Sequence, residues 1–280
     1  MQKVYFFFLF SILLFFSGCN TDPDYEDNTA FKQLSRNEDF KRAHEDPAEI
    51  GKLPLTGEMI EFKVSKGNKT SAYLVKASKP TKNWLIVYHE WWGLNGYIKK
   101  ESDHLANELK NVNILALDLY DGKIATTADD ASKLVNETSD KRIEQIIQDA
   151  LGYIGDTCKI ATIGWCFGGG WSLQTAIVAG KQDIGCVMYY GMPEKDMAKI
   201  NKIECPVLGI FAKRDKGITP KLVEEFQTKM NYSQKPLRVK YYDADHAFAN
   251  PSNPHFNREA AAEANNIVIA FLKDRYQTSK

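Results

Sequence analysis

Four side chains that can take part in acyl transfer each follow a short β-rich run. Glu90 comes after "LIVYH", Cys166 after "IATIGW", Asp215 after "VLGIFAK" and His246 after "LRVKYYDAD". In a parallel sheet the carboxyl ends of the strands meet at one edge, so we expect these groups to converge. A thiol, an imidazole and a carboxylate together support nucleophilic catalysis. The order predicts Cys166 as nucleophile, His246 as its proton acceptor and Asp215 as the group that fixes the imidazole.

The surroundings of Cys166 strengthen this prediction. The stretch "IATIGWCFGGGWSLQ" puts Gly164 two residues before the thiol and Gly168 two residues after it, between a predicted strand and a predicted helix. A sharp strand-to-helix turn strains the nucleophile and leaves no room for side chains at these glycines. The N-terminus of the helix should lower the pKa of the thiol. The alternative is a buried structural cysteine with glycines that serve only packing.

The identity of the acid is open between three aspartates. Asp243 and Asp245 are closer to His246 along the chain than Asp215 is. We favour Asp215, because it ends a strand that follows the nucleophile. The chain order of nucleophile, acid and histidine is that of α/β-hydrolases.

The elements that must position these groups read as one α/β domain over residues 55–280. "MIEFKV" and "SAYLVK" predict an antiparallel hairpin. Beyond them, β-rich runs alternate with segments of helical period, over 143–154 and 260–271 among others, and Thr219 before Pro220 predicts a helix start. This alternation predicts a mostly parallel, doubly wound sheet with helices on both faces.

Four motifs in this order, "HEWWGLN", "GWCFGG", "GIFAKRD" and "YYDADHAFANPSNP", resemble the dienelactone hydrolase family over about residues 55–275. The resemblance implies an α/β-hydrolase fold and cysteine-dependent opening of carboxylic esters or lactones through a thioester. It implies that Glu90 pairs with the thiol and helps to form the thiolate. It also implies an oxyanion hole made by the backbone N–H groups of Phe167 and Trp91.

One motif departs from the family pattern. Dienelactone hydrolases resemble "HSFAR" after the catalytic histidine and use the arginine to hold the substrate carboxylate, whereas this chain reads "HAFAN" and ends in Asn250. We therefore expect a small ester or lactone other than the dienelactone. Trp92, Tyr190 and Asn250 are the predicted substrate-binding residues, because aromatic side chains beside a nucleophile favour an apolar pocket.

The N-terminus predicts export. Residues 1–19 combine Lys3, an apolar run and "FSGC", which resembles a bacterial lipoprotein signal peptide that leaves Cys19 as the lipidated first residue. Phe16 stands where that pattern prefers leucine, and an uncleaved anchor or an ordinary signal peptide is the alternative. Residues 20–54 are polar and read as a tether with a short helix near Phe40. We expect a monomeric lipoprotein held at a membrane, in the periplasm or at the cell surface.

Several function classes are disfavoured. Lys plus Arg and Asp plus Glu are 36 each, so no net charge favours nucleic acid. No phosphate-binding glycine motif occurs. His44, His104 and His255 have no partner at metal-ligand spacing, and we expect no metal and no organic cofactor. The remaining alternative is a catalytically silent lipoprotein that binds a small ligand.

Cys158, Cys186 and Cys205 lie in or at the start of strand-like runs. A small buried side chain is the commoner role for such cysteines, although spacing alone leaves a disulfide open in an oxidising compartment.

Overall fold

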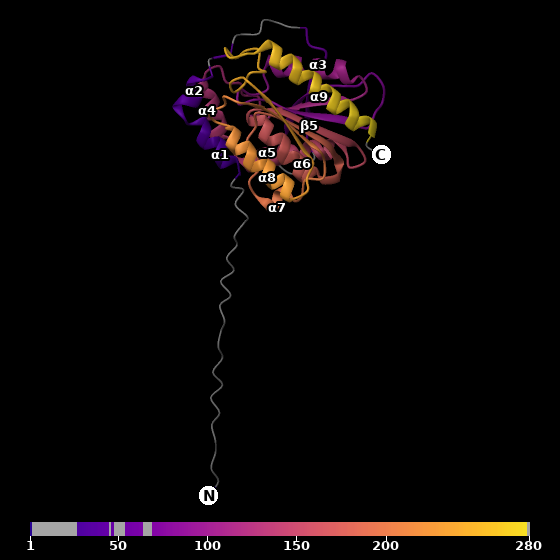
Figure 1. The fold of residues 1–280 in the computed structure, drawn as a ribbon. Helices are drawn as coiled ribbons and strands as arrows, with labels where there is room; N and C mark the ends of the chain where they lie inside the picture. Colours follow the sequence, from indigo (N-terminus) through magenta and orange to yellow (C-terminus); the bar gives the residue numbers. More distant parts are fainter. Residues whose placement is uncertain (2–26, 45, 48–53, 64–68, 279–280) are drawn as a thin grey trace.

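The protein was analysed as a computed structural model, which describes Met1 and residues 27–44, 46–47, 54–63 and 69–278 (Figure 1). Its described residues contain an eight-stranded sheet in the order β1-β2-β4-β3-β5-β6-β7-β8. β2 pairs antiparallel with β1 and with β4, and the other neighbours are parallel. The strands are β1 (Glu58–Phe62), β2 (Thr70–Val75), β3 (Asn83–Tyr88), β4 (Asn113–Leu117), β5 (Lys159–Trp165), β6 (Asp183–Tyr189), β7 (Val207–Ala212) and β8 (Leu237–Tyr242).

Helices cover both faces of the sheet. α3 and α9 lie side by side on one face, and α5, α6 and α8 lie on the other (Figure 1). The helices are α1 (Asp27–Ser35), α2 (Glu38–Arg42), α3 (Gly96–Leu109), α4 (Ala128–Glu137), α5 (Asp140–Ile154), α6 (Phe167–Ala179), α7 (Met197–Ile200), α8 (Pro220–Tyr232) and α9 (Arg258–Thr278), with a 3-10 turn at Gly180–Gln182. The predicted mostly parallel sheet with helices on both faces is confirmed.

The local sequence explains why these elements form. Every residue of β7 is buried, as expected for a central parallel strand covered by helices on both sides. The Thr219 hydroxyl oxygen accepts a hydrogen bond from the backbone N–H of Leu222 at 3.3 Å, and Pro220 occupies the first turn of α8. Phe226 and Met230 of this helix are buried against the sheet.

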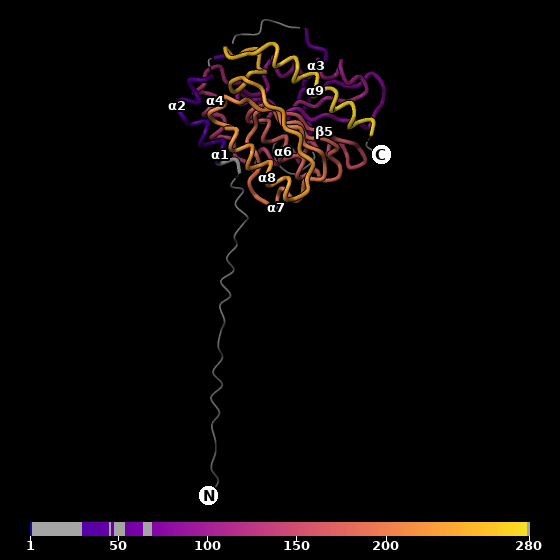
Figure 2. The backbone as a smooth tube through the Cα atoms, viewed as in Figure 1, coloured from indigo at the N-terminus to yellow at the C-terminus, as the bar shows by residue number. Residues whose placement is uncertain are grey.

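The segment predicted as a tether needs a correction. Its residues 27–44 form α1 and α2, which contact each other and α4, a helix far away in sequence (Figure 2). Phe31 and Phe40, which have no apolar repeat around them in sequence, are 1% and 6% exposed. Burial of these two phenylalanines, together with the ion pairs of Lys32 with Asp140 and of Lys41 with Asp129, holds the segment on the domain. The expected short helix near Phe40 is α2.

The predicted signal peptide, Cys19 and residues 20–26 lie outside the described residues. Within the described part of the chain, no helix is both long and apolar enough to span a bilayer. Cys158, Cys166, Cys186 and Cys205 are all free thiols, and all but the half-buried Cys158 are buried. No disulfide therefore joins these four cysteines.

Candidate active site

Cys166 stands at the turn from β5 into α6, as the glycine spacing predicts. Its backbone has φ 53° and ψ −116°, which a residue with a side chain adopts only under constraint. The constraint is visible in the hydrogen bonds: Cys166 N–H donates to the Tyr189 carbonyl at 2.9 Å, and its own carbonyl accepts from Gly169 N–H at 3.0 Å. A Cβ on Gly168 would come within 2.5 Å of the Tyr88 carbonyl oxygen, and one on Gly164 would clash with the first turn of α6.

His246 lies beside the thiol. Its Nε2 is 3.2 Å from Cys166 Sγ, and its Nδ1 is 2.5 Å from Asp215 Oδ2. The other Asp215 oxygen accepts backbone N–H bonds from Gly217 and Ile218, both at 2.8 Å, which fixes the carboxylate. An ionised carboxylate can accept hydrogen bonds but cannot donate them, so Nδ1 of His246 carries the proton and Nε2 faces the sulfur.

The strand-end loops that carry these groups are joined to each other. Lys213 N–H and Arg214 N–H donate to the carbonyls of Tyr242 and Ala244, at 2.8 and 3.0 Å. These two bonds continue the β7–β8 pairing past the strand ends, so the loops bearing Asp215 and His246 move as one unit.

The two alternative acids point elsewhere. Asp243 and Asp245 form exposed ion pairs with Arg214, at 2.6 and 3.2 Å. Asp215 is the aspartate that contacts the imidazole, in agreement with its strand-end position.

Glu90 follows β3 and is 6% exposed. One of its carboxylate oxygens accepts a short hydrogen bond from Asn250 Nδ2, and the other accepts from the Tyr190 hydroxyl at 3.5 Å. Its carbonyl accepts from His89 Nδ1 at 2.5 Å and from Gly93 N–H at 3.2 Å, so the turn after β3 is held in place. Glu90 therefore has two neutral hydrogen-bond donors and no cation among these partners.

Burial sets the charge state of Glu90 and Cys166. It raises the pKa of Glu90 to about 7, against opposing effects of His246 and of the two donors. It also raises the pKa of the Cys166 thiol, although His246 and the Phe167 N–H act in the other direction. The N–H at the start of α6 thus acts in the predicted direction, but desolvation outweighs it in this conformation and the net shift is upward. Burial would lower the pKa of His246, but Asp215 and the sulfur raise it well above its ordinary value.

The thiol is closed off. Cys166 is only 1% exposed, although a nucleophile has to be reached by its substrate. The N-terminal helices account for much of the cover: the Phe31 ring lies 5.3 Å from that of Phe167, and the Phe40 ring lies 5.3 Å from that of His246. His44, just past α2, brings a ring nitrogen within 4.8 Å of Cys166 Sγ and of a His246 ring nitrogen. Burial lowers the pKa of His44 to about 3, so its imidazole is neutral.

The two predicted oxyanion-hole donors come from different elements. Phe167 is the first residue of α6, where N–H groups have no partner within the helix, and its N–H stabilises the thiolate form of Cys166. Trp91 follows Glu90 in the turn after β3 and is 0% exposed. Its side chain packs on Trp92 at 5.2 Å between ring centroids.

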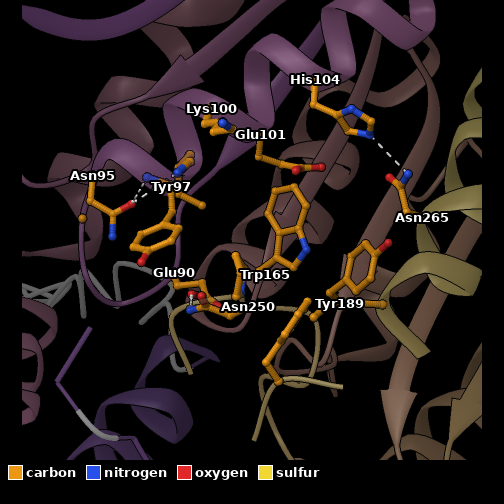
Figure 3. Close-up of a pocket in the computed structure, with 16 residues that line it drawn as sticks. Glu90, Asn95, Tyr97, Lys100, Glu101, His104, Trp165, Tyr189, Asn250 and Asn265 are labelled. Atoms are coloured by element: carbon orange, nitrogen blue, oxygen red, sulfur yellow. Dashed lines mark hydrogen bonds between the residues drawn. The ribbon is translucent and has the colours of Figure 1, made fainter. Parts of the chain in front are cut away.

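A cavity of about 380 Å³ opens between α3 and α9 and ends on Glu90 and Asn250 (Figure 3). Trp165 and Tyr189 line it from the ends of β5 and β6. Asn250, one of the three predicted substrate-binding residues, therefore lines this cavity. Trp92 and Tyr190 are not among the described residues that line this cavity: both are buried, and the Tyr190 ring packs 5.0 Å from that of His246.

Sequence reasoning missed two parts of this region. The cavity wall from the helices, which has Tyr97, Lys100, Glu101 and His104 on α3 and Asn265 on α9, carries no motif. His44 was also missed, because its neighbours in space come from distant strands and no spacing along the chain signals them. Only the isolated Phe31 and Phe40 in a polar segment could have indicated that this segment packs.

The chain matches the family model described as "Dienelactone hydrolase family" over residues 70–276. It is 31% identical over 252 residues to the "Putative carboxymethylenebutenolidase" of Saccharolobus solfataricus, covering 76% of this chain and 96% of that protein. It is 23% identical to "Carboxymethylenebutenolidase 1" of Cupriavidus pinatubonensis, covering 77% and 97%.

Solved structures share the fold. A dienelactone hydrolase-like promiscuous phosphotriesterase from metagenomic libraries superposes with a TM-score of 0.69 at 19% identity, covering 79% of this chain and 98% of that one. The eight-stranded sheet with its turn at Cys166 is thus an α/β-hydrolase fold. Since the family match spans most of the chain and a relative above 30% identity covers three quarters of it, this protein is a hydrolase that belongs to the dienelactone hydrolase family.

Proposed function

We propose that the protein hydrolyses small carboxylic esters or lactones through a thioester on Cys166. The observation that carries this proposal is the hydrogen-bonded series from Cys166 Sγ to His246 Nε2 at 3.2 Å and from His246 Nδ1 to Asp215 at 2.5 Å. A nucleophile, a base within reach of it and a third group that orients the base are the parts that acyl transfer needs.

The chemistry follows from these contacts. The Cys166 sulfur attacks the carbonyl carbon while its proton goes to His246 Nε2, and the Phe167 and Trp91 N–H groups stabilise the oxyanion. Collapse breaks the bond to the alkoxide, which takes the proton from His246. His246 then removes a proton from water, which attacks the thioester and releases the acid. A lactone gives one hydroxy acid, because its acyl and alkoxy parts stay joined.

The floor of the cavity supports a neutral substrate, although Lys100 lines the wall on α3. Its floor holds the Glu90 carboxyl and the Asn250 amide, with Glu101 further up the wall. Asn250 is neutral and already bonded to Glu90, so it offers no charge to a substrate carboxylate. Trp165 and Tyr189 add flat apolar surface suited to an alkyl or aromatic ester. The carboxymethylenebutenolidase names of the relatives describe those proteins, and the absent arginine argues for another ester here.

Hydrolysis requires the thiol to become reachable. Cys166 is 1% exposed, and α1 and α2 lie outside the sheet that forms the centre of the domain. Displacement of this N-terminal segment is therefore the proposed opening step. Local opening of a peripheral segment costs far less free energy than unfolding of the sheet.

Hydrolysis of p-nitrophenyl acetate tests the proposal. Cys166→Ala should lower the rate at least roughly 100-fold, because no other group supplies the nucleophile. Cys158→Ala, which removes a half-buried thiol at the start of β5, is the matched control and should keep the wild-type rate. Equal rates for wild type and Cys166→Ala would exclude the nucleophile. If no short ester is hydrolysed while a small ligand raises the melting temperature, the protein is a binding protein instead.

We also propose that lipid on Cys19 holds a monomeric, exported protein at a membrane. The signal-peptide pattern "FSGC" and the polar residues behind it support this. Cys19→Ala should move the protein out of the membrane fraction, and mass spectrometry of the wild-type N-terminal peptide should find a lipid-modified cysteine. Membrane retention of Cys19→Ala would contradict the anchor.

A further inference from the structure

His44 presents an unused nitrogen to the nucleophile. The side chain is 3% exposed, and its ring centroid lies 4.7 Å from that of Trp91 and 5.2 Å from that of His246. Its Nδ1 lies 2.7 Å from the Phe40 carbonyl oxygen. A carbonyl can only accept, so Nδ1 carries the proton and Nε2 carries a lone pair. Nε2 is buried and has no hydrogen-bond partner in the described part of the chain.

A buried acceptor without a partner is costly, by roughly 1–3 kcal/mol, and calls for an explanation. The ligand atoms of His44, Cys166 and His246 all lie within 4.8 Å of one another. In both histidines Nδ1 is fixed, in His44 by the Phe40 carbonyl and in His246 by the Asp215 carboxylate, which leaves Nε2 as the nitrogen available to a metal. Histidines that bind metal have this arrangement, because the outer hydrogen bond orients the ring.

We propose that Cys166, His246 and His44 form a binding site for zinc or another thiophilic divalent cation. One sulfur and two imidazole nitrogens suit zinc, whereas magnesium and calcium prefer oxygen. Zinc–sulfur and zinc–nitrogen bonds of about 2.3 and 2.0 Å place tetrahedral ligand atoms about 3.3–3.6 Å apart. The His44 ring therefore has to approach by about 1 Å, which a residue at the end of a short peripheral helix can do. The fourth position is open to water.

Zinc binding and thiol chemistry exclude each other. The cation takes the sulfur and the His246 Nε2 lone pair, and the proton that these two atoms share leaves to solvent. Cys166 can then no longer attack a carbonyl, and His246 can no longer accept a proton. The metal also joins the N-terminal segment, through His44, to the ends of the central strands. Zinc therefore holds the closed form and inhibits reversibly.

Cobalt is the spectroscopic probe for this site. Full-length protein in detergent, cleared of metal with a chelator, should bind one Co²⁺ with thiolate-to-cobalt absorption and the strong visible bands of tetrahedral cobalt. Zinc should bleach these bands stoichiometrically. Cys166→Ser should lose the thiolate absorption.

His44→Ala should weaken metal binding roughly 100-fold, since it removes one of three protein ligands. His44→Cys keeps a ligand and should retain tight binding, which separates coordination from a merely structural role. His255→Ala, which removes an exposed histidine, is the control and should bind like wild type. Unchanged cobalt affinity in His44→Ala, or no thiolate absorption in wild type, overturns the site.

The absorption readout does not depend on ester hydrolysis. Tight cobalt binding without any ester hydrolysis would refute the proposed function and keep the metal site. Ester hydrolysis without cobalt binding would do the reverse. Where both hold, zinc should inhibit p-nitrophenyl acetate hydrolysis, a chelator should restore it, and His44→Ala should need at least tenfold more zinc for half inhibition.

Discussion

Glu90→Gln should make the protein's stability less sensitive to a rise in pH from about 4.5 to about 7. Glu90 is 6% exposed, and burial raises its pKa from the ordinary 4.5 to about 7. The replacement fits the contacts: the glutamine oxygen can accept from Asn250, and its amide can donate to the Tyr190 hydroxyl, which accepts as well as donates. The substitution thus removes the titration and keeps the shape.

The sign follows from the two states. In the unfolded chain Glu90 loses its proton near pH 4.5, whereas in the folded protein it keeps the proton up to about pH 7. Ionisation between these values therefore favours the unfolded state, and the free energy of unfolding falls as pH rises. A pKa difference of this size lowers the free energy of unfolding by about 3 kcal/mol. The full loss is present above pH 7, and no loss is present below pH 4.5. In Glu90→Gln this fall is absent.

Urea unfolding of wild type and variant between pH 5 and pH 8.5 measures the effect. The free energy of unfolding of the variant minus that of wild type should rise by about 2–3 kcal/mol across this range. A constant offset between the curves reflects altered hydrogen bonds and does not bear on the reasoning. Parallel curves would refute it, because they would mean that Glu90 ionises equally easily in the folded and unfolded protein.

Two further predictions concern the acid and the glycines of the turn. Asp215→Asn should lower the rate of p-nitrophenyl acetate hydrolysis roughly 10³–10⁴-fold, because the imidazole loses its orienting carboxylate. Asp243→Asn breaks only an exposed ion pair, so its rate should stay near that of wild type. Equal losses would reassign the acid. Gly168→Ala should lower the free energy of unfolding in urea by roughly 3 kcal/mol, since the added methyl group would clash with the backbone at the end of β3. In Gly170→Ala the added methyl group is 3.5 Å from its nearest neighbour, so the free energy of unfolding should rise by up to about 1 kcal/mol. Similar effects at both glycines would contradict the packing argument.

The convergence of Glu90, Cys166, Asp215 and His246 could be predicted from sequence for a simple reason. Each follows a β-rich run, and such runs become parallel strands whose ends meet at one edge. The runs before Glu90, Cys166 and Asp215 are mostly or fully buried, whereas the run before His246 forms the half-buried edge strand β8. The turn glycines and the start of α8 were equally readable, because each depends on a few neighbouring residues. The strand order, with β4 between β2 and β3, depends instead on how crossovers pack.

The cover over the site could not be predicted, because its signals are not local. Residues 27–44 have no helical apolar repeat. Phe31 and Phe40 pack on Phe167 and His246, which are distant in sequence, so their role is visible only in the folded structure. The net rise of the Cys166 pKa could not be predicted for the same reason. A helix N-terminus is visible in sequence, but the depth of burial that outweighs it appears only in the folded structure.

The position of α1 limits how far the domain can stand from a lipid on Cys19. Seven residues lie between Cys19 and Asp27, and the eight steps from one Cα to the other span at most about 29 Å in a fully extended chain. This linker is therefore shorter than the bilayer is thick, and it leads directly into the helices that lie over the nucleophile. On the lipoprotein proposal, the closed domain is held within this distance of the headgroups, and displacement of the N-terminal segment would both open the site and lengthen the tether.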